Sequence, residues 1–357
     1  MNLKLSDSLR QVSRLTVSVL PDFFYDRLVS VPSLDRLFKE AKAKAAAGGG
    51  SLRGYSQSEI RGGNAVNLAF CLASLSVKTT LYCIGDSHAR YLLAERPENC
   101  KVRVIAGQPG FTVALESPLR GRMANVMISD VGGIVNFDGR ALNRIDTTHL
   151  GKSDCIALTN WSANKRGNEL ARKVFSLPGR RARLNFLDPA DLTGAEGRIK
   201  PLRRLVDQGL VDVISLNENE TSIMMKVLSL GRLPKHYRAP DVIKASAKLH
   251  AVLHARIDVH TPIGSATAYN EEQVWVSSPG LVKGYATGAG DAWDAADIIG
   301  SLLRLLPRER LQFANAYAYL HITRRTRAPS LKGVERFLRG GMRFGVRSIH
   351  EREQPAR

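Results

Sequence analysis

Apolar residues in this chain alternate between short continuous runs and stretches with helical spacing. The short runs, bounded by Gly, Pro or Asp, predict buried strands. They lie at 15–20, 79–86, 155–160, 182–188, 211–217, 255–263 and 273–278. Helical spacing predicts helices within 34–47, 61–77, 165–177, 196–208, 218–229, 287–300 and 308–345. This alternation indicates an α/β fold, with a doubly wound, mostly parallel sheet flanked by helices.

Between about 101 and 140 the pattern changes to short segments of alternating polarity, KVRVIAG, GFTVALES, ANVMISD and GIVNFDG. Gly, Pro and Asp separate them, which is typical of antiparallel hairpins. We expect a small β-sheet lid formed by about 23–33 and 101–140, carried by one α/β domain over 14–345. Residues 1–13 are then an N-terminal extension and residues 346–357 a basic C-terminal tail.

The chain has 357 residues, 44% of them hydrophobic, which is enough for one large core. Its apolar runs are too short to span a bilayer, and its start lacks a signal-peptide pattern, so we expect a cytoplasmic protein with no membrane partner. Cys71, Cys83, Cys100 and Cys155 show neither C-x-x-C pairing nor metal-ligand spacing, which favours buried free thiols.

The formal net charge is +19. A solvated basic surface, attraction of anionic small molecules such as nucleotides, and weak nonspecific nucleic-acid binding are each compatible with it. The sequence has no aromatic-rich basic stripe of the type that binds single strands, so we do not expect nucleic acid as a partner.

The candidate chemistry centres on TGAGDAWDAADIIG, residues 287–300. Gly288, Ala289 and Gly290 have little or no side chain, so their backbone can approach a ligand closely. The unpaired N–H groups and positive dipole end of the following helix form an anion site, with Asp291 among them. This is the layout that a phosphotransferase needs. An ordinary helix start with an acidic first turn is the alternative.

Two glycines also open an earlier helix. Gly62 and Gly63 precede it, and Asn64 and Asn67 stand on its first turn. Amide side chains at such a start suggest recognition of hydroxyl groups, although ordinary capping would give the same pattern.

Acidic residues stand at two other strand ends. Asp22 and Asp26 follow the first strand, at the edge where open parallel sheets bind ligands. They are either ligand-binding residues or loop carboxylates bound by turn amides. Asn217 and Glu220 share one face of a helix start. They could hold a hydrated Mg²⁺ and phosphate oxygens, or form a capping box.

Taken together, these motifs resemble the ribokinase-like kinases, also called the phosphofructokinase-B type, over roughly residues 14–330. That family shows an Asp past the first strand, a Gly-Gly followed by Asn, an N-x-x-E motif and a C-terminal G-A-G-D. The matching positions here are Asp26; Gly62, Gly63 and Asn67; Asn217 and Glu220; and Gly288 to Asp291.

The resemblance implies an enzyme that transfers a phosphoryl group from ATP or ADP, with Mg²⁺, to an acceptor hydroxyl, usually a hydroxymethyl. Asp291 would be the base, and the amides of Gly288, Ala289 and Gly290 would stabilise the transferring group. Asp26, with Asp22 near it, Gly62, Gly63 and Asn67 would hold the acceptor. Asn217 and Glu220 would order Mg²⁺ through water. Further nucleotide-side candidates are Thr261, Gly264, Thr287 and Asn315.

The chain also departs from the family pattern. Tyr285, Ala286 and Thr287 stand where many members have Asp-Thr-Thr, and the missing Asp argues against a monovalent-cation site. Asp294 and Asp297 are additional acids where the family often carries apolar residues or Gly. Asp294 lies one helical turn beyond Asp291, where it could perturb the base or face solvent.

The insert through GGGSLRG, 48–54, resembles an archaeal branch of the family whose acceptors include nucleosides and ribose phosphates. It favours a pentose-containing acceptor, while a hexose, fructose 6-phosphate or another sugar remains open. Arg61, Arg120 and Arg122 would suit an anionic acceptor if they point inward. A weakly catalytic nucleic-acid-binding or regulatory protein on the same fold is the alternative from another class. Lids of this family often pair, so a homodimer through the lid is expected.

Overall fold

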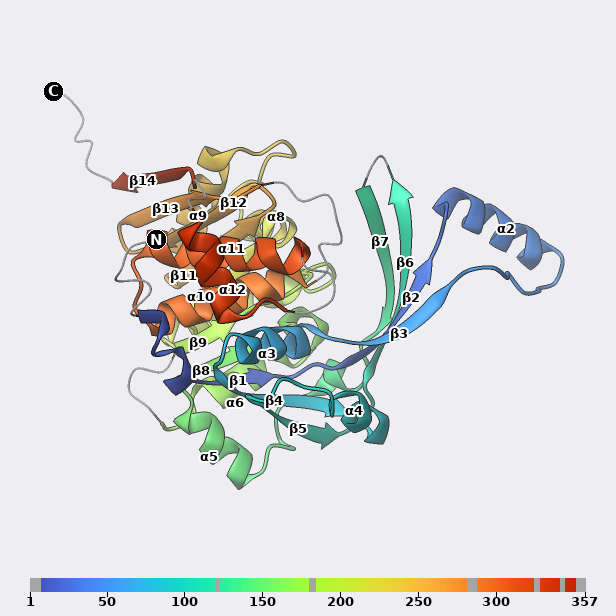
Figure 1. Ribbon diagram of the computed structural model, residues 1–357, viewed down its shortest axis with the longest axis horizontal. Helices are drawn as coiled ribbons and strands as arrows, with labels where there is room; N and C mark the ends of the chain where they lie inside the picture. Colours follow the sequence, from blue (N-terminus) through green and yellow to red (C-terminus); the bar gives the residue numbers. More distant parts are fainter. Residues whose placement is uncertain are drawn as a thin grey trace.

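The described strands form two sheets, a ten-stranded core sheet and a four-stranded lid sheet (Figure 1). The structure is a computed structural model that describes residues 8–119, 122–179, 184–280, 288–323, 328–340 and 344–350. The core strands are β1 (Thr16–Leu20), β4 (Lys78–Gly85), β5 (Cys100–Ala106), β8 (Cys155–Leu158), β9 (Leu184–Leu187), β10 (Val213–Asn217), β11 (Arg256–Thr261), β12 (Gly264–Tyr269), β13 (Glu272–Ser277) and β14 (Val346–His350).

The core sheet has the strand order β14-β13-β12-β11-β10-β9-β8-β1-β4-β5. Strands from β11 to β5 in this order run parallel, and β12, β13 and β14 extend the sheet antiparallel. The chain moves from β1 outward to β4 and β5, then continues on the other side of β1 with β8. Ligands bind outside the carboxyl ends of the strands at such a reversal point. The fold therefore places the expected site just beyond β1 and β8.

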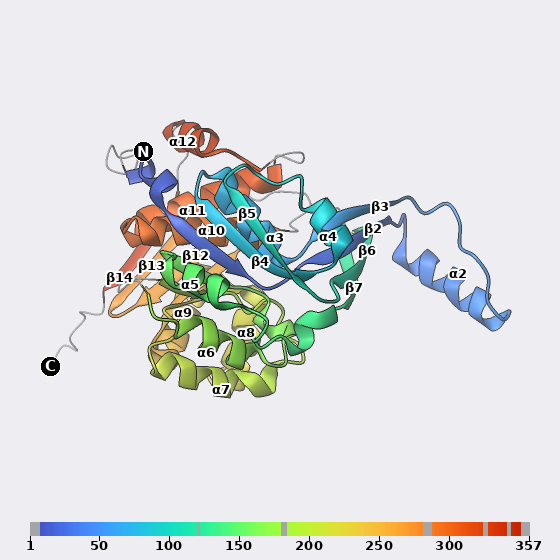
Figure 2. The same cartoon turned by 90° about the horizontal axis from the view of Figure 1, so that it is seen from below.

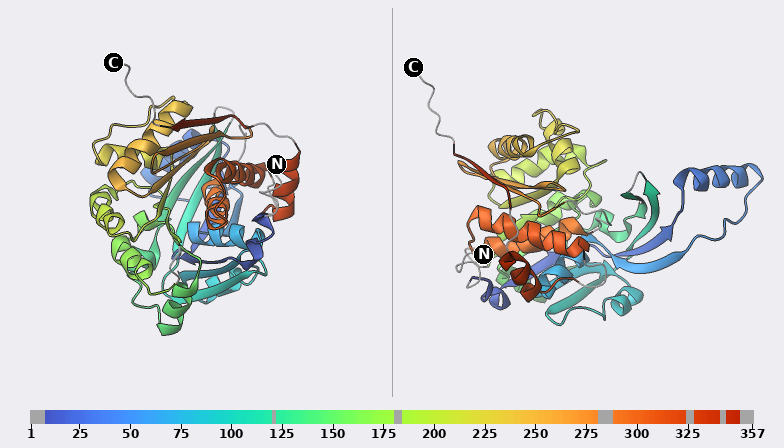
Figure 3. Two further views of the ribbon diagram at one scale, coloured as in Figure 1. Left: turned by 90° about the vertical axis from the view of Figure 1, so that its left-hand side faces the viewer. Right: turned by 45° about the horizontal axis from the view of Figure 1, so that its top comes forward.

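Helices cover both faces of the core sheet (Figures 2 and 3). One layer contains α3 (Asn64–Ser74), α10 (Ala289–Leu302), α11 (Pro307–Thr323) and α12 (Leu331–Arg339). The opposite layer contains α5 (Arg144–Lys152), α6 (Gly167–Phe175), α7 (Glu196–Asp207), α8 (Glu218–Val227) and α9 (Ala239–Leu253). In α10, the fully buried Ala292, Ala295 and Ala296 are small enough to let the helix pack closely. The doubly wound α/β prediction is confirmed.

The lid sheet stands beyond the carboxyl edge of the core sheet, with the strand order β3-β2-β6-β7 (Figure 1). Its strands are β2 (Phe24–Ser30), β3 (Gln57–Gly62), β6 (Gly110–Leu119) and β7 (Arg122–Asp130). α2 (Leu34–Ala46), between β2 and β3, projects from the lid and has no buried residue. A lid was predicted, but its bounds differ from 23–33 and 101–140.

Three segments correct those bounds. β5 belongs to the core sheet, where it pairs with β4. As an edge strand it buries only some of its side chains, which gives the alternation that we attributed to a hairpin. β3 was not expected because its side chains are almost all exposed. GIVNFDG forms a 3-10 helix, η2 (Gly132–Asn136), in place of a strand.

The two ends of the described chain are more integrated than expected. Leu9 and Val12 are buried in the core, so the described part of the predicted extension, 8–13, contributes to packing, and 1–7 lie outside the described residues. The predicted tail, 346–357, begins as β14, and 351–357 lie outside the described residues. Short α4 (Ser87–Leu92), α5 and α9 had not been predicted. Within the described ranges, no helix combines the length and the apolar character needed to cross a membrane.

A buried ion cluster joins α10 and α11 to the middle of the core sheet. Arg310, only 3% exposed, donates to Asp258 and to Asp297, and Arg256 also bonds both carboxylates. Burial opposes ionisation of Asp258, but Arg256 and Arg310 lower its pKa to about 2. Burial raises the pKa of Asp297 to about 6, although Arg310 and Arg256 oppose the shift. Near pH 7 both carboxylates are therefore ionised and paired with the two arginines.

Replacing Arg310 with Ala should strongly destabilise the fold, because it leaves two buried carboxylates with Arg256 as their only cation. Removing one partner of a buried ion pair costs about 3–5 kcal/mol. Urea unfolding followed by circular dichroism measures the loss. The control is Arg308→Ala, an exposed arginine on the same helix, which should change stability by less than about 0.5 kcal/mol. Equal stability of the two variants would contradict the prediction.

Candidate functional site

Asp291 lies in the first turn of α10, at the carboxyl edge of the core sheet. Gly288 is the residue before the helix and has φ 76°, a left-handed conformation that favours glycine. No described side chain caps this helix start, so its amides remain available to a ligand. Asn64 Nδ2 donates to Asp291 Oδ1 at 3.0 Å and Asn67 Nδ2 to Oδ2 at 2.9 Å. The structure thus brings the Gly-Ala-Gly-Asp motif and the α3 asparagines together.

The environment of Asp291 makes its carboxylate more basic than usual. Burial is the main reason that its pKa lies well above the ordinary value, and the charge of Asp188 acts in the same direction. The amide donors of Asn67 and Asn64 oppose this shift. A buried carboxylate that is oriented by neutral donors is suited to accept a proton.

Gly63 and Asp22 together form the start of α3. Gly63 has φ 108°, and a Cβ there would lie 2.9 Å from Asp22 Oδ2, so the position requires glycine. Asp22 is fully buried, and it accepts hydrogen bonds from the Ala65 amide at 3.0 Å and the Thr159 hydroxyl at 2.9 Å. Its carboxylate therefore connects the end of β1 to α3. We assign Asp22 to positioning, and contact with the acceptor remains a prediction.

Asp26 lies on the lid, against the backbone of Gly62. A Cβ on Gly62 would overlap the Asp26 carboxylate, at 2.0 Å from Oδ2, so this glycine makes room for the acid. Burial raises the pKa of Asp26 to about 6; Thr112 opposes the shift and Asp22 adds to it. The predicted acceptor residues Asp26, Gly62 and Gly63 are thus neighbours at the junction of lid and core.

Asn217 and Glu220 form the capping box that we considered as the alternative. The Asn217 side chain accepts from the Glu220 amide at 3.0 Å, and the Glu220 carboxylate accepts from the Asn217 amide at 2.8 Å. Burial raises the pKa of Glu220 well above its usual value, and Asp188 contributes to the shift. Capping and metal ordering are compatible, because the box holds the carboxylate at the carboxyl edge.

Asp188 was not predicted as a site residue, although it is the last residue of a predicted strand at the same edge. Its Oδ1 accepts from the Ala190 amide at 2.8 Å. Burial raises its pKa to about 6, and the charge of Asp22 adds to the effect. The available signal was an acid at a strand end, in NFLDPA, the argument that we applied to Asp22.

The predicted nucleotide-side residues have different environments. Thr261 donates to the Gly264 carbonyl at 2.7 Å and closes the β11–β12 hairpin, and Gly264 has φ 147°. Asn315 is buried; it donates to the carbonyls of Val276 and Ser277 and accepts from Trp293 and Ser265. These bonds occupy its amide, which gives Asn315 a positioning role. Thr287, like Tyr285, Ala286 and Arg120, lies outside the described residues.

Two histidines beside Gly288, Ala289 and Gly290, which we call the anion loop, were also not predicted. The His260 ring stacks on Trp293 with centroids 5.1 Å apart, and its Cε1 would lie 3.2 Å from a Cβ on Gly290. Burial lowers the pKa of His260 to about 4, so the ring is neutral near pH 7. His321 Nε2 would lie 3.5 Å from a Cβ on Gly288. Burial lowers the pKa of His321 too. Both rings therefore lie against the loop without adding positive charge.

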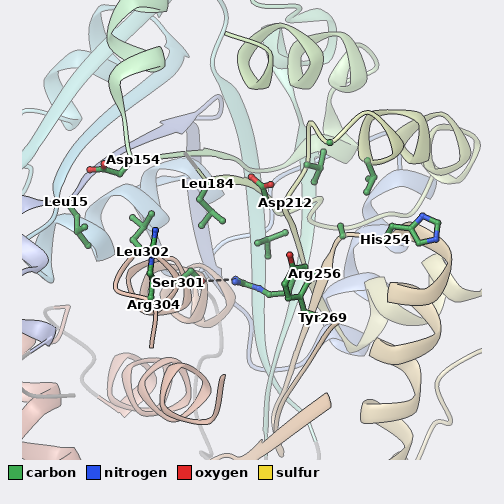
Figure 4. Close-up of a pocket in the computed structure, with 15 residues that line it drawn as sticks. Leu15, Asp154, Leu184, Asp212, His254, Arg256, Tyr269, Ser301, Leu302 and Arg304 are labelled. Carbon is green, nitrogen blue, oxygen red and sulfur yellow. Dashed lines mark hydrogen bonds between the residues drawn. The ribbon is translucent and has the colours of Figure 1, made fainter. Parts of the chain in front are cut away.

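A separate cavity of about 660 Å³ opens at the opposite, amino edge of the core sheet (Figure 4). Residues at the beginnings of β1, β9, β10 and β11 and at the end of α10 line it. Arg256 and Ser301 are bonded to each other there at 2.8 Å. None of the predicted site residues contributes to its lining.

Comparisons with known proteins bear on the fold. Neither the known protein-family models nor the curated protein sequences gave a match. A ribokinase from Thermotoga maritima superposes with a TM-score of 0.69 and 19% identity, covering 91% of this chain and 99% of that one. A Cryptococcus neoformans ribokinase in complex with ADP superposes with a TM-score of 0.70 and 12% identity, covering 90% of this chain and 98% of that one. Adenosine kinase from Sinorhizobium meliloti superposes with a TM-score of 0.67 and 14% identity, covering 91% of this chain and 98% of that one.

The chain has a ribokinase-like fold. The superposition covers 91% of this chain, so the predicted resemblance is confirmed at the level of the fold. The archaeal branch stays a prediction.

The ribokinase-like fold also raises the question of Mg²⁺, and the acidic residues fit it. Asp188, Glu220 and Asp294 are buried carboxylates without a salt bridge to any described Lys or Arg. Hard oxygen donors and uncompensated negative charge suit this cation. In the part of the chain that is described, no group of three or more ligating side chains could enclose a metal ion.

If Asp291 acts as a base, the pH dependence of that reaction should reveal its raised pKa. Because only the ionised carboxylate can accept a proton, kcat/KM should fall as pH decreases through that raised pKa. Asn64→Ala removes a donor that favours the ionised form, so it should move the acidic limb to higher pH. The measurement is a pH–rate profile at saturating Mg²⁺. Asn143→Ala, at a cap on α5, is the control and should leave the limb in place; an unmoved limb in Asn64→Ala would contradict the assignment.

Proposed function

We propose that this protein is a Mg²⁺-dependent kinase that transfers a nucleotide phosphoryl group to a hydroxymethyl group of a small, pentose-containing acceptor. The observation that carries the proposal is the placement of Asp291. Its buried carboxylate is held by two neutral amides beside the uncapped amides of α10. A carboxylate that can accept a proton thus lies beside backbone amides that can bind an anion, beneath the lid.

The proposed reaction uses these groups in a fixed arrangement. Asp291 accepts the proton of the acceptor hydroxyl as that oxygen bonds to the transferring phosphorus and the bond to the nucleotide breaks. The amides of Gly288, Ala289 and Gly290 receive the negative charge on the phosphoryl oxygens. Asp188 and Glu220 would hold Mg²⁺ through water, and the ion supplies charge neutralisation when bound. Positioning and electrostatics are the main contributions in such transfers.

The side chains on the lid face that carries Asp26 favour an acceptor that is neutral and partly apolar. Strand register places Ile60, Thr112 and Ala114 on the lid face that carries Asp26, and Met127 lies opposite Ala114. The same alternation places no Lys or Arg of the described lid strands on that face.

Of the arginines that we considered for an anionic acceptor, Arg61 points away from that face. Register places Arg61 beside Tyr25, on the other face, with its guanidinium 4.8 Å from the centre of the Phe70 ring. Arg120 and the side chain of Arg122 lie outside the described part of the chain. We therefore favour a nucleoside or free pentose over a phosphorylated sugar.

A nucleotide-consumption screen tests the proposal. Pentoses, hexoses, their phosphates and nucleosides are each offered with ATP and with ADP, in the presence of Mg²⁺. We expect turnover with a neutral pentose-containing acceptor and a KM that changes little with ionic strength, because no ion pair holds the acceptor. Turnover only with phosphorylated sugars would overturn the acceptor class. No turnover with any pair, together with binding of nucleic acid, would favour the regulatory alternative.

Asp291→Asn should abolish most of that turnover while the protein still binds nucleotide. The amide keeps the shape of the side chain but cannot accept the proton, so kcat should fall by about 10³-fold or more. Nucleotide affinity, measured by calorimetry, should change little. Asp130→Asn, an exposed acid on the lid, is the control with the same charge change. A kcat within tenfold of wild type would remove Asp291 from the role of base.

We also propose that the protein forms a homodimer through the lid face opposite Asp26. Phe111, Val113, Val126 and Ile128 are 39–63% exposed, and register places them on that one face. A contiguous apolar patch of this kind marks an interaction surface.

Ile128→Lys should convert the dimer to a monomer, because it buries a charge in the apolar interface. Light scattering after size exclusion measures the mass. The matched control is Ile145→Lys on α5, which is still more exposed but lies outside the lid and should leave the mass unchanged. A monomeric wild-type protein would refute the proposed dimer.

A further inference from the structure

His321 lies on α11, one helical turn after Tyr317, and its ring is held from two sides. The ring packs against the Tyr317 ring, with centroids 6.4 Å apart, and its Nδ1 lies 4.0 Å from Cys71 Sγ on α3. The Tyr317 hydroxyl donates to the Cys71 carbonyl at 3.3 Å, which ties α11 to α3. These contacts fix the direction of the ring, so its other nitrogen, Nε2, faces one defined place.

That place is the space beside the Gly288 Cα. A Cβ built on Gly288 would lie 3.5 Å from His321 Nε2, 3.8 Å from Asn67 Nδ2 and 4.0 Å from Asp291 Oδ2. Apart from the chain neighbours of Gly288, no described side chain comes closer to that point than 3.5 Å. Because the residue is glycine, the space stays open. Three polar atoms, from α3, α10 and α11, therefore border a space that a small group can enter.

The hydrogen-bonding character of these atoms differs. The ionised Asp291 carboxylate only accepts, and Asn67 Nδ2 donates one of its two hydrogens to it at 2.9 Å, which leaves the second. Burial raises the pKa of the Cys71 thiol to about 12, so Sγ keeps its proton and can donate to Nδ1 of His321. The proton of the neutral ring is then on Nε2, which has no hydrogen-bond partner among the described residues.

Two donors and one acceptor thus border the same space, and this decides what fits there. An oxygen that carries a hydrogen suits all three, because it can accept from His321 and Asn67 and donate to Asp291. An ionised phosphoryl oxygen does not fit, because it has no proton to give and is repelled by the charge of Asp291. The space is therefore suited to a hydroxyl group.

We propose that His321 is a further residue that contacts the acceptor, with its Nε2–H donating to the reacting hydroxyl while that hydroxyl donates to Asp291. The inference deepens the proposed function and rests on it, since this hydroxyl belongs to the proposed hydroxymethyl group. During transfer the hydroxyl proton moves to Asp291, the oxygen bonds to phosphorus, and the bond from phosphorus to the nucleotide breaks. The proton on Nε2 stays on His321, which orients the hydroxyl without giving or taking a proton.

Calorimetry with the full-length protein tests the contact. The probes are D-ribose and adenosine, each compared with its 5-deoxy analogue, which lacks the hydroxyl of the hydroxymethyl group. No nucleotide is added, so the measurement does not depend on turnover. His321→Leu removes the donor, whereas His321→Gln keeps one, because the amide nitrogen of Gln reaches about as far as Nε2.

We expect His321→Leu to weaken binding of D-ribose or adenosine by about tenfold, the usual effect of losing one hydrogen bond to a ligand hydroxyl. His321→Gln should bind within about threefold of wild type. The 5-deoxy analogues should bind wild type and His321→Leu equally, because they lack the group that the donor contacts.

Two comparisons separate this contact from a packing role. The affinity of His321→Leu for nucleotide should equal that of wild type, whereas a packing defect would weaken both ligands and would not be restored by Gln. The same two substitutions at His149, an exposed histidine on α5, are the matched control and should leave binding of all probes unchanged.

The inference is overturned if wild type binds neither D-ribose nor adenosine, or if His321→Leu binds them as tightly as wild type. It is also overturned if His321→Leu loses as much affinity for the 5-deoxy analogues, because water would then fill the space. The acceptor screen judges the proposed function separately. Binding that depends on His321, without turnover of any acceptor, would remove the kinase proposal and keep the contact; turnover that His321→Leu leaves unchanged would do the reverse.

Discussion

The two hydrogen bonds from Asn64 and Asn67 to Asp291 hold this site together. They connect the start of α3 to the start of α10, more than 220 residues apart in the chain. Because each bond uses a different carboxylate oxygen, the plane of the carboxylate is fixed with respect to both helix starts. The Gly-Gly turn and the amides of Gly288, Ala289 and Gly290 are thereby held in place around the Asp291 carboxylate. The geometry of the whole site depends on this pairing.

The same helix shows why the donors to Asp291 are amides. Asp297, nearly two helical turns deeper, is bonded by Arg256 and Arg310. Burial raises its pKa to about 6, but both arginines oppose that shift and favour the ionised form. An arginine beside Asp291 would lower its pKa and reduce its basicity. Neutral amides orient the carboxylate at a smaller electrostatic cost, so burial can still raise its pKa. One helix therefore carries one acid held by charged donors and one held by neutral donors.

Much of the fold could be predicted from the sequence because strand and helix periodicities are local. The parallel strands and the start of α10 were found in this way, whereas β3 and β5 were missed or misplaced because edge strands bury few side chains. The site residues also divide into those that the local sequence indicates and those that depend on neighbours in the fold. Gly288 and Gly63 are indicated by local backbone demands. Asp188 and the bonds of Asn315 depend on which strands and helices become neighbours, and a single sequence does not contain that information.

The lid connects the site to the rest of the fold through its base. The Tyr25 hydroxyl donates to Asp86 at 2.5 Å, and Asp86 caps α4, so the first residues of β2 are tied to the core. Asp22 ties the chain just before β2 to α3 in the same way. Beyond these ties, α2 and β3 have few buried side chains, whereas Val29, Val31 and Leu115 form a small buried cluster inside the lid. Regions with few buried apolar contacts open at low free energy. The edge formed by α2 and β3 is therefore the part of the lid that opens most readily, while the base stays tied to the core.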